Sequence, residues 1–327
     1  MPIGSPRQVT VPAIRARKAG PGAAADGGDG QPLVMVTAYD APGARIADEA
    51  GVDLILVGDS LGMVVLGHHD TLQVTMDDMV RHTAAVSRAQ PRALVVADLP
   101  WLSYHLGTED TVRNGARLVR AGAQAVKLEG GAKRARAVAA LADAEIPVVG
   151  HLGLTPQSIH AMGGYQVQAT DPAAAEALLD DALALWRAGC FAIVVEGVPA
   201  AVARTVTEAV SVPTIGIGAG PWCDGQVLVF HDLLGLEDRR APRFVRRYAS
   251  LKADAVGAVS AFAADVRAGR FPSEEESYGG IDEMAPVLDL HRAGRDGLDP
   301  DAAPLSGPGS TPALLAEGGP LPRPAGC

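Results

Sequence analysis

A unit that occurs three times constrains this chain most strongly. In each copy an Ala-Gly dipeptide leads into a short apolar run, and an acidic residue follows that run. The dipeptides are Ala50-Gly51, Ala121-Gly122 and Ala188-Gly189, and the acids are Asp59, Glu129 and Glu196. Each copy is typical of a helix that ends at a glycine, followed by a buried strand with an acid at its C-terminal end. Such repetition predicts alternating helices and parallel strands.

A second type of strand lies between these units and begins at a proline, where the sheet needs no backbone donor. Strands of this type are expected at 91–98, 147–151 and 213–218. Further strands are expected at 33–37 and 227–231, which gives eight in all. Helices are expected at 43–50, 76–89, 109–121, 132–142, 172–188, 200–209 and 244–268, with a single turn after the seventh strand.

Eight such units in about 250 residues predict a (β/α)₈ barrel, the TIM-barrel fold. The competing arrangement is an open, doubly wound sheet. No Gly-x-Gly-x-x-Gly opens a helix after the first strand, and the acids are spread over many strand ends, so the barrel is favoured. A hydrophobic content of 48% with only 4% aromatic residues also suits parallel strands covered by helices.

The predicted barrel occupies residues 31–282. Residues 1–30 form an N-terminal extension, in which 9–18 could pack as a short strand or helix and 19–30 is a Gly- and Ala-rich flexible spacer. Residues 283–327 are dense in Pro, Gly and Ala without apolar periodicity, which predicts a disordered C-terminal tail.

Charge and cysteine usage exclude some function classes. The net charge of −10 argues against nucleic acid as the main partner, although it does not exclude a small anionic substrate. The cysteines Cys190, Cys223 and Cys327 show no metal or disulfide spacing, which favours a reducing, cytoplasmic location. There is no signal-peptide pattern and no apolar run of membrane-spanning length, so no membrane association is expected.

Polar residues gather at the predicted strand ends, and a barrel brings these ends to one mouth. They are Tyr39, Asp40, Asp59, Ser60, Asp98, Lys127, Glu129, His151, Glu196 and Gly218. So many carboxylates with one lysine and one histidine would repel one another unless a cation binds. A set of oxygen ligands without cysteine indicates Mg²⁺ or a similar hard ion rather than Zn²⁺.

Structural alternatives exist for several of these residues. Asp40 is best interpreted as the N-cap of the next helix. Asp59 could also be an N-cap, or it could bind a ligand. Asp98 could form a turn or bind a ligand, and His151 could be a structural histidine. The Gly-rich segment 215–220 resembles a phosphate cradle only weakly. Lys127 and Glu129 point to the same face of a strand, so an internal ion pair between them is a further alternative.

Several motifs in one order resemble the ketopantoate hydroxymethyltransferase family. They are Thr37-Ala-Tyr-Asp40, Val57-Gly-Asp-Ser-Leu-Gly-Met63, Ala97-Asp-Leu-Pro100, Val126-Lys-Leu-Glu-Gly-Gly131, Gly150-His-Leu-Gly-Leu-Thr-Pro-Gln157, Gly163-Gly-Tyr165 and Ile215-Gly-Ile-Gly-Ala-Gly220. The resemblance runs from about Val9 to Tyr278. It implies a barrel of the phosphoenolpyruvate/pyruvate type, usually assembled as a homodecamer. The implied reaction converts 3-methyl-2-oxobutanoate into 2-dehydropantoate for pantothenate synthesis, with 5,10-methylenetetrahydrofolate as co-substrate.

The resemblance also implies roles for individual residues. The metal carboxylates fall on Asp59, Asp98 and Glu129, which would hold one Mg²⁺ per subunit. Substrate contacts fall on Ser60 and Lys127, with Asp59, Asp98 and His151 lining the same site. The proton acceptor falls on Glu196. The family commonly has Glu-Cys-Val-Pro where this chain has Glu196-Gly-Val-Pro199, so the neighbour of the base differs.

The expected chemistry joins these roles. A 2-oxo acid chelates a hard cation, which stabilises the enolate formed when the C3 proton leaves. Lys127 would hold the substrate carboxylate with help from Ser60, and Glu196 would remove the C3 proton. The rival enzyme is a metal-dependent 2-oxo acid carbon–carbon lyase of the same barrel group, which needs no folate. The rival from another class is a barrel that only binds or assembles, which the crowding of charges at one mouth disfavours.

Overall fold

The computed structural model describes residues 8–18, 31–237 and 241–278 of the 327-residue chain. The chain divides into two compact units, Met1–Ala258 and Val259–Cys327. The predicted spacer 19–30 and the predicted tail 283–327 lie outside the described residues.

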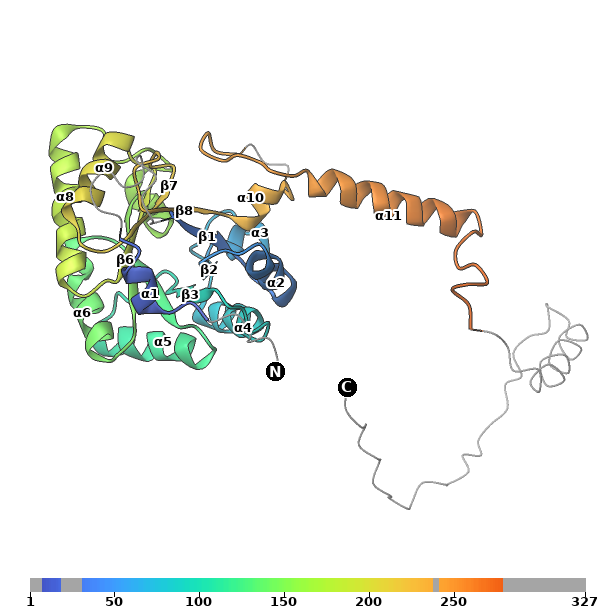
Figure 1. Ribbon diagram of the computed structural model, residues 1–327, viewed down its shortest axis with the longest axis horizontal. Coiled ribbons are helices and arrows are strands. Elements are labelled where there is room, and N and C mark those ends of the chain that lie inside the picture. Colours follow the sequence, from blue (N-terminus) through green and yellow to red (C-terminus); the bar gives the residue numbers. More distant parts are fainter. Residues whose placement is uncertain (1–7, 19–30, 238–240, 279–327) are drawn as a thin grey trace, which may run out of the picture. The chain divides into compact units, whose positions relative to one another are not determined.

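The first unit contains a closed barrel of eight parallel strands in chain order, β1 to β8 (Figure 1). The strands are β1 Leu33–Thr37, β2 Leu54–Val57, β3 Leu94–Asp98, β4 Ala125–Glu129, β5 Val148–Gly153, β6 Ala192–Glu196, β7 Thr214–Ile217 and β8 Gly225–Leu228. Because β1 pairs with both β2 and β8, the sheet has no free edge. The predicted (β/α)₈ barrel is confirmed.

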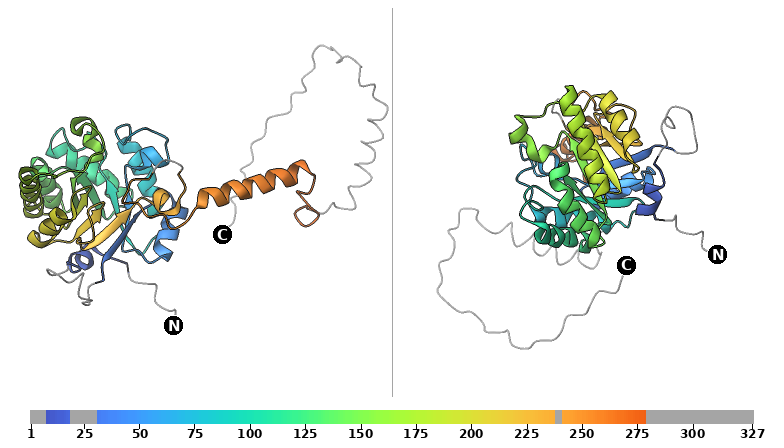
Figure 2. Two further views of the ribbon diagram at one scale, coloured as in Figure 1. Left: turned by 90° about the horizontal axis from the view of Figure 1, so that it is seen from above. Right: turned by 90° about the vertical axis from the view of Figure 1, so that its left-hand side faces the viewer.

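Helices follow the strands and lie around the outside of the barrel (Figures 1 and 2). They are α2 Ala41–Glu49, α3 Leu61–Val64, α4 Met76–Ser87, α5 Thr108–Arg120, the 3₁₀ turn η1 Ala132–Arg134, α6 Ala135–Asp143, the 3₁₀ turn η2 Pro156–Ser158, α7 Ile159–Met162, α8 Pro172–Arg187, α9 Ala200–Ala209 and α10 Phe230–Leu234. Some of them begin with side-chain caps: Asp40 accepts the Gly43 amide at the start of α2, as expected, and Thr75 with Asp78 forms a capping box on α4.

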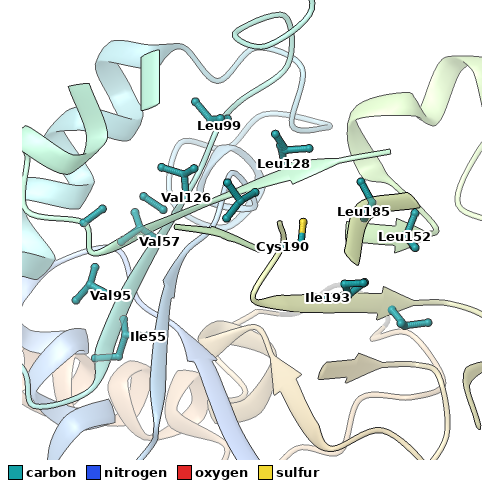
Figure 3. Packing of buried hydrophobic residues seen from close by; sticks show 14 of the residues in the cluster. Ile55, Val57, Val95, Leu99, Val126, Leu128, Leu152, Leu185, Cys190 and Ile193 are labelled. Carbon is teal, nitrogen blue, oxygen red and sulfur yellow. The ribbon is translucent and has the colours of Figure 1, made fainter. Parts of the chain in front are cut away.

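Alternation along the strands separates two apolar clusters. On β2, Leu54 and Leu56 belong to the cluster inside the barrel, whereas Ile55 and Val57 pack in the cluster between the strands and the helices. Figure 3 shows residues of this outer cluster, with Leu185 of α8 near Ile193 of β6. The same two-residue period determines which side chains of the remaining strands point into the barrel.

The N-terminal end of the barrel is closed by the chain's own beginning. Residues 9–18 were predicted as a strand or a helix, and they contain the short helix α1, Val11–Arg15. Ile14 is 1% exposed and packs inside the barrel with Leu33 and Met35. Lys18 Nζ lies 2.9 Å from Asp224 Oδ2 and donates to the Thr207 carbonyl at 2.6 Å. The base of the barrel is therefore filled and closed.

Two predicted elements differ from the structure. The eighth strand was expected at 227–231, but it begins at Gly225, and Phe230 already starts α10. A side chain at Gly225 would meet the Leu33 carbonyl oxygen at 2.5 Å, so the glycine that looks like part of a loop is what allows β8 to approach β1. The last helix was expected from residue 244, but it begins only at Leu251.

This last helix, α11 Leu251–Arg267, has no buried residue. Its apolar side chains Val256, Val259, Phe262 and Val266 are between 46% and 66% exposed. Phe262 makes an edge-on ring contact with Phe271, with 5.2 Å between the ring centroids. Within the described residues, no helix is both long and apolar enough to cross a membrane.

Candidate active site

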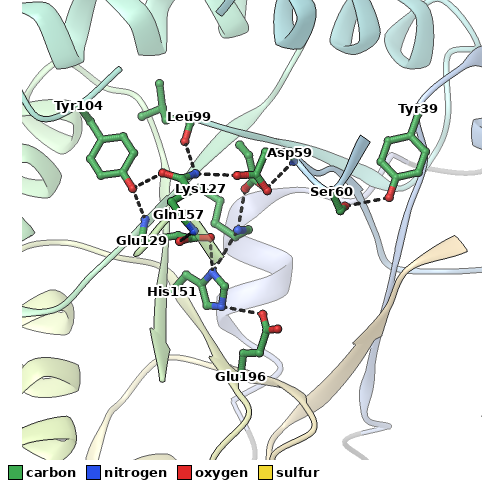
Figure 4. A network of polar contacts seen from close by, with 11 residues as sticks. Tyr39, Asp59, Ser60, Leu99, Tyr104, Lys127, Glu129, His151, Gln157 and Glu196 are labelled. Atoms are coloured by element: carbon green, nitrogen blue, oxygen red, sulfur yellow. Dashed lines mark hydrogen bonds and ion pairs between the residues drawn. The ribbon is translucent and has the colours of Figure 1, made fainter. Parts of the chain in front are cut away.

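Strand alternation places five charged side chains in one layer inside the barrel, at the C-terminal ends of its strands. They are Asp98, Lys127, Glu129, His151 and Glu196, of which the last four are labelled in Figure 4. Asp98, Lys127, His151 and Glu196 each follow, at a spacing of two, a residue of the inner apolar cluster, and Glu129 follows Lys127 at the same spacing. The strand register sets Asp98 opposite Lys127 and Glu129 opposite His151. The sequence prediction that these strand ends converge is therefore consistent with the geometry.

Lys127 forms a buried ion pair with Asp98. Its Nζ lies 2.8 Å from Asp98 Oδ1 and 3.3 Å from His151 Nδ1. The alternative of an ion pair between Lys127 and its strand neighbour Glu129 is wrong, because the lysine pairs across the sheet. Burial alone would lower the pKa of Lys127, but the surrounding carboxylates outweigh it and raise the pKa above its ordinary value.

Asp59 follows β2 and completes the acidic group. Its backbone amide donates to Asp98 Oδ2 at 3.0 Å, and its Oδ2 accepts from Gln157 Nε2 at 2.8 Å. Burial, followed by the charges of Asp98 and Glu129, raises the pKa of Asp59 well above its ordinary value. Burial also raises the pKa of Asp98, against the lowering effect of Lys127. Together these carboxyl groups are more crowded than the local positive charge can offset.

Ser60 lies next to Asp59 and faces Tyr39. The Tyr39 hydroxyl and Ser60 Oγ are 2.9 Å apart, so the two side chains share a hydrogen bond at the wall of the site. Gly58 is required here, since a side chain at that position would meet Ser60 Oγ at 2.8 Å. The backbone thus approaches the serine closely, as the glycines around the Asp59 motif suggested.

His151 links two carboxylates on different strands. Its Nδ1 lies 3.3 Å from Glu129 Oε1, and its Nε2 lies 3.1 Å from Glu196 Oε2. Burial and Lys127 would lower the pKa of His151, but its hydrogen bonds to the two glutamates raise it to about 9. For Glu129, burial would raise the pKa, yet the contacts with His151 and Lys127 lower it. His151 therefore lies between the two glutamates and contacts both of them.

Gln157 and Tyr104 are contacts that sequence reasoning missed. The Gln157 side chain donates to Asp59 and to the Leu99 carbonyl, and its backbone amide donates to Glu129 Oε2 at 2.9 Å. The Tyr104 hydroxyl donates to Gln157 Oε1 at 2.6 Å and accepts from the Glu129 amide. Gln157 ends the quoted motif 150–157, but nothing in the motif shows which carboxylates its amide would reach.

The charged layer forms the inner end of a cavity of about 540 Å³ at the mouth of the barrel. Nearer to solvent the cavity is lined by Met63, Tyr165 and Phe244, and Gly218 of the Gly-rich segment also lines it. Asp40 does not line this cavity, because its side chain caps α2 instead. His82 is not part of the lining either, and its Nδ1 lies 2.6 Å from the Tyr39 carbonyl oxygen. The cavity therefore has a polar inner end and an apolar outer part.

The donor set of the inner end fits a hard cation. Asp59, Asp98 and Glu129 are each 5% exposed or less, and all offer carboxylate oxygens. In the described part of the chain, no three His, Cys, Asp or Glu side chains already converge as a complete metal site. Mg²⁺ prefers oxygen ligands and completes its shell with water and substrate oxygens, so carboxylates of this kind suit it even where they do not already form a complete site.

Comparison with known proteins decides the family. The family model described as ketopantoate hydroxymethyltransferase matches residues 23–274. The chain belongs to the ketopantoate hydroxymethyltransferase family. The resemblance seen in the motifs is thereby confirmed.

Named relatives in this family are close in sequence. The 3-methyl-2-oxobutanoate hydroxymethyltransferase of Moorella thermoacetica is 54% identical over 272 residues, which cover 83% of this chain and 98% of that protein. The enzyme of the same name from Pyrobaculum islandicum is 58% identical over 244 residues, which cover 75% of this chain and 93% of that protein.

Solved structures of more distant proteins share the fold. Phosphonopyruvate hydrolase matches with a TM-score of 0.54 at 15% identity, covering 88% of this chain and 98% of that one. 2,3-Dimethylmalate lyase, described as a member of the PEP mutase/isocitrate lyase superfamily, matches with a TM-score of 0.53 at 16% identity, covering 89% and 97%. At this level of identity the likenesses show a shared fold, and they agree with the eight-stranded barrel.

Proposed function

We propose that this protein transfers a hydroxymethyl group to 3-methyl-2-oxobutanoate, giving 2-dehydropantoate for pantothenate biosynthesis, with 5,10-methylenetetrahydrofolate as the donor. The observation that carries this proposal is the buried charged layer at the mouth of the barrel, in a chain 54% identical to a relative of that activity. Four carboxyl groups face one lysine and one histidine there, which is an arrangement suited to an anionic substrate bound with a cation.

The reaction balances without an oxidant. The C3–H bond of the oxo acid breaks, and a bond forms between C3 and the carbon of the methylene group. Water supplies the hydroxyl oxygen, and tetrahydrofolate leaves. The protein must therefore hold the oxo acid, remove one proton from C3 and admit the folate to the same carbon.

The metal in this proposal is one Mg²⁺ per subunit, held by Asp59, Asp98 and Glu129. When bound, it supplies Lewis-acid stabilisation of the negative charge that develops on the oxo acid. The raised pKa of Asp59 supports this role, because burial beside Asp98 and Glu129 makes its negative charge costly until a cation lies nearby.

The substrate carboxylate belongs with Lys127, and Ser60 is the neutral donor on the opposite wall. Lys127 is 4% exposed and already directs its ammonium group at Asp98 inside the cavity. The carboxylate of an anionic substrate would be a second partner for this ammonium group. The lysine side chain would not have to leave the cavity to bind it. His151 lines the same space and keeps Glu129 and Glu196 apart as an intervening cation.

Glu196 is the proposed base for the C3 proton. Glu196 ends β6, whereas Asp59 follows β2 and Asp98 ends β3, and all three side chains line the same cavity. Gly153 permits this position of Glu196, because a side chain at residue 153 would meet the Glu196 carbonyl oxygen at 2.2 Å. The departure Gly197 also has a structural use: it has a φ of 57°, which glycine adopts readily.

Turnover with a metal series tests the proposal. Purified protein should form 2-dehydropantoate only when oxo acid, methylenetetrahydrofolate and a divalent cation are all present, and Mg²⁺ should support the reaction. Cleavage of a 2-oxo acid without folate would instead indicate the carbon–carbon lyase. Absence of product under all metal conditions would contradict the proposed transfer.

We further propose a cytoplasmic homodecamer. The helix α11 supports self-association, because Val256, Val259, Phe262 and Val266 expose apolar surface to solvent in the single chain. Sedimentation equilibrium should give ten times the chain mass of 33.5 kDa. A monomeric mass at micromolar concentration would contradict the assembly.

A further inference from the structure

The cavity is larger than an oxo acid needs. Its volume of about 540 Å³ lies within the range that encloses drug-sized ligands. The charged layer occupies only the inner end, and the proposed donor must bring its methylene carbon to C3 of the oxo acid from the remaining side. The rest of the donor must then lie between the charged layer and solvent.

The outer part of the cavity has walls suited to a flat ring. The Tyr165 hydroxyl lies 3.6 Å from Met63 Sδ, so the segment after β5 reaches α3 across the mouth. On another side, Phe244 lies against Gly218, where a side chain would meet the phenyl ring at 2.7 Å. Thioether sulfur and aromatic faces favour contact with planar heteroaromatic groups.

Thr71 adds a polar group that lacks a partner. It lines the cavity and is 2% exposed, and its Oγ1 has no hydrogen-bond partner among the described residues. A buried hydroxyl without a partner destabilises the folded protein, and a ligand that bonds to it removes that cost. A pterin carries amide and amine donors and a carbonyl acceptor at the edge of its ring, so it can satisfy this hydroxyl.

We propose that Thr71, Met63, Tyr165 and Phe244 form the subsite for the pterin ring of methylenetetrahydrofolate. Arg243, exposed at the rim of the same cavity, faces the carboxylates of the glutamate tail. The subsite rests on the proposed function, since it takes its occupant from the one-carbon donor. It assigns the folate to the outer part of the cavity and the oxo acid to the charged layer.

The sharpest test compares two threonines. Thr71→Val removes the hydroxyl from the cavity wall while keeping the shape of the side chain. Thr83→Val is the matched control, because Thr83 is also fully buried with an unpartnered Oγ1, but it lies on α4 and does not line the cavity. In Thr71→Val the KM for methylenetetrahydrofolate should rise about fivefold, as for one lost hydrogen bond. In Thr83→Val it should stay at the wild-type value.

A second pair tests the ring wall. Phe244→Ala should raise the KM for methylenetetrahydrofolate about tenfold, through loss of aromatic contact with the pterin. Tyr248→Ala is the control, because Tyr248 is an exposed aromatic residue of the same segment that does not line the cavity. Urea unfolding of all four variants should show that each is folded under assay conditions.

The outcomes separate the subsite from the function. Wild-type turnover with a wild-type folate KM in both Thr71→Val and Phe244→Ala overturns the subsite and leaves the proposed function intact. An equal rise of KM in Thr71→Val and Thr83→Val also overturns it, because the effect then comes from any buried hydroxyl. If the wild-type protein gives no folate-dependent product, the proposed function fails, and the subsite fails with it.

Discussion

Each end of the barrel contains a lysine–aspartate pair with a buried carboxylate, and the two pairs have different surroundings. At the base, Lys18 and Asp224 are 2.9 Å apart, and Asp224 Oδ2 also accepts from the Thr214 amide and hydroxyl. Arg17 likewise lies 3.0 Å from Asp53, so each of these acids has its own cation. At the mouth, Lys127 pairs with Asp98, but Asp59 and Glu129 crowd the same space.

The difference separates a structural ion pair from a site. A buried pair whose remaining lone pairs are satisfied by the protein can close a fold. A group of acids with too few neighbouring cations can bind a further cation. Until it does so, the crowded carboxylates destabilise the folded protein. The base therefore holds the barrel together, while the mouth is arranged for ligands that carry positive charge or displace a carboxylate.

The largest expected effect concerns the mouth. Glu196→Gln keeps the shape of the side chain but removes the base, so the rate of C3 proton exchange in 3-methyl-2-oxobutanoate should fall by about 10²- to 10⁴-fold. Exchange into deuterated water, followed by NMR, measures this rate without folate. Glu208→Gln, on the surface of α9, is the control. Exchange at the wild-type rate in Glu196→Gln would remove this residue as the base.

The next effect concerns the base of the barrel. Lys18→Met removes the ammonium group that lies 2.9 Å from the buried carboxylate of Asp224, which should reduce the free energy of unfolding by about 3 kcal/mol in a urea titration. Catalytic constants of the folded variant should stay at wild-type values, because Lys18 lies at the opposite end from the cavity. Arg113→Met breaks the two surface ion pairs of Arg113 with Glu109 and Asp110 on α5 and should cost less than about 1 kcal/mol. Equal losses in the two variants would refute a structural role for the base pair.

A third effect concerns the contacts that orient the acids at the mouth. Gln157→Met removes the amide that donates to Asp59, so calorimetric Mg²⁺ affinity should fall about 10- to 100-fold. Gln124→Met removes an amide acceptor from the start of β3, away from the mouth, and should leave Mg²⁺ affinity unchanged. Wild-type Mg²⁺ affinity in Gln157→Met would show that Asp59 needs no such support.

The smallest effect depends on pH. Burial, with Arg134 and Lys133 nearby, lowers the pKa of half-buried His105 to about 4 from 6.5. Between these values the unfolded chain binds a proton that the folded protein does not, so the free energy of unfolding falls as the pH decreases. Solvent screening limits the loss to about 1 kcal/mol. His105→Gln should flatten this part of the stability profile in urea titrations, and an unchanged slope would contradict the assignment.

The sequence predicted the charged layer because the relevant rule is local. Lys127 and Glu129 are two residues apart, so they share a strand face whatever the rest of the chain does. The position of Asp98 followed from the same period on its own strand. What remained open was the choice of partner: Lys127 pairs with Asp98 because the strand register sets them side by side, and register depends on all eight strands.

The features that sequence reasoning missed depend on loops and on distant segments. Phe244 was predicted in a helix, but it lines the cavity, since its conformation follows its contact with Gly218 rather than its propensity. Gln157 lies in a turn, where no periodicity shows which way its amide points. The start of β8 at Gly225 was also missed, because the need for a glycine there arises from Leu33, which is its partner on the adjacent strand β1 but lies near the other end of the sequence.

The closure of the base by the first residues has a consequence for how the protein forms. Lys18 contacts Thr207 and Asp224, about 200 residues further along the chain, and β1 pairs with β8. During synthesis the N-terminal segment leaves the ribosome long before these partners exist. Ile14 and Leu33 must then stay exposed until the last strand is made. We therefore expect closure to be a late, slow step, in which chaperones that bind apolar segments increase the yield of folded protein.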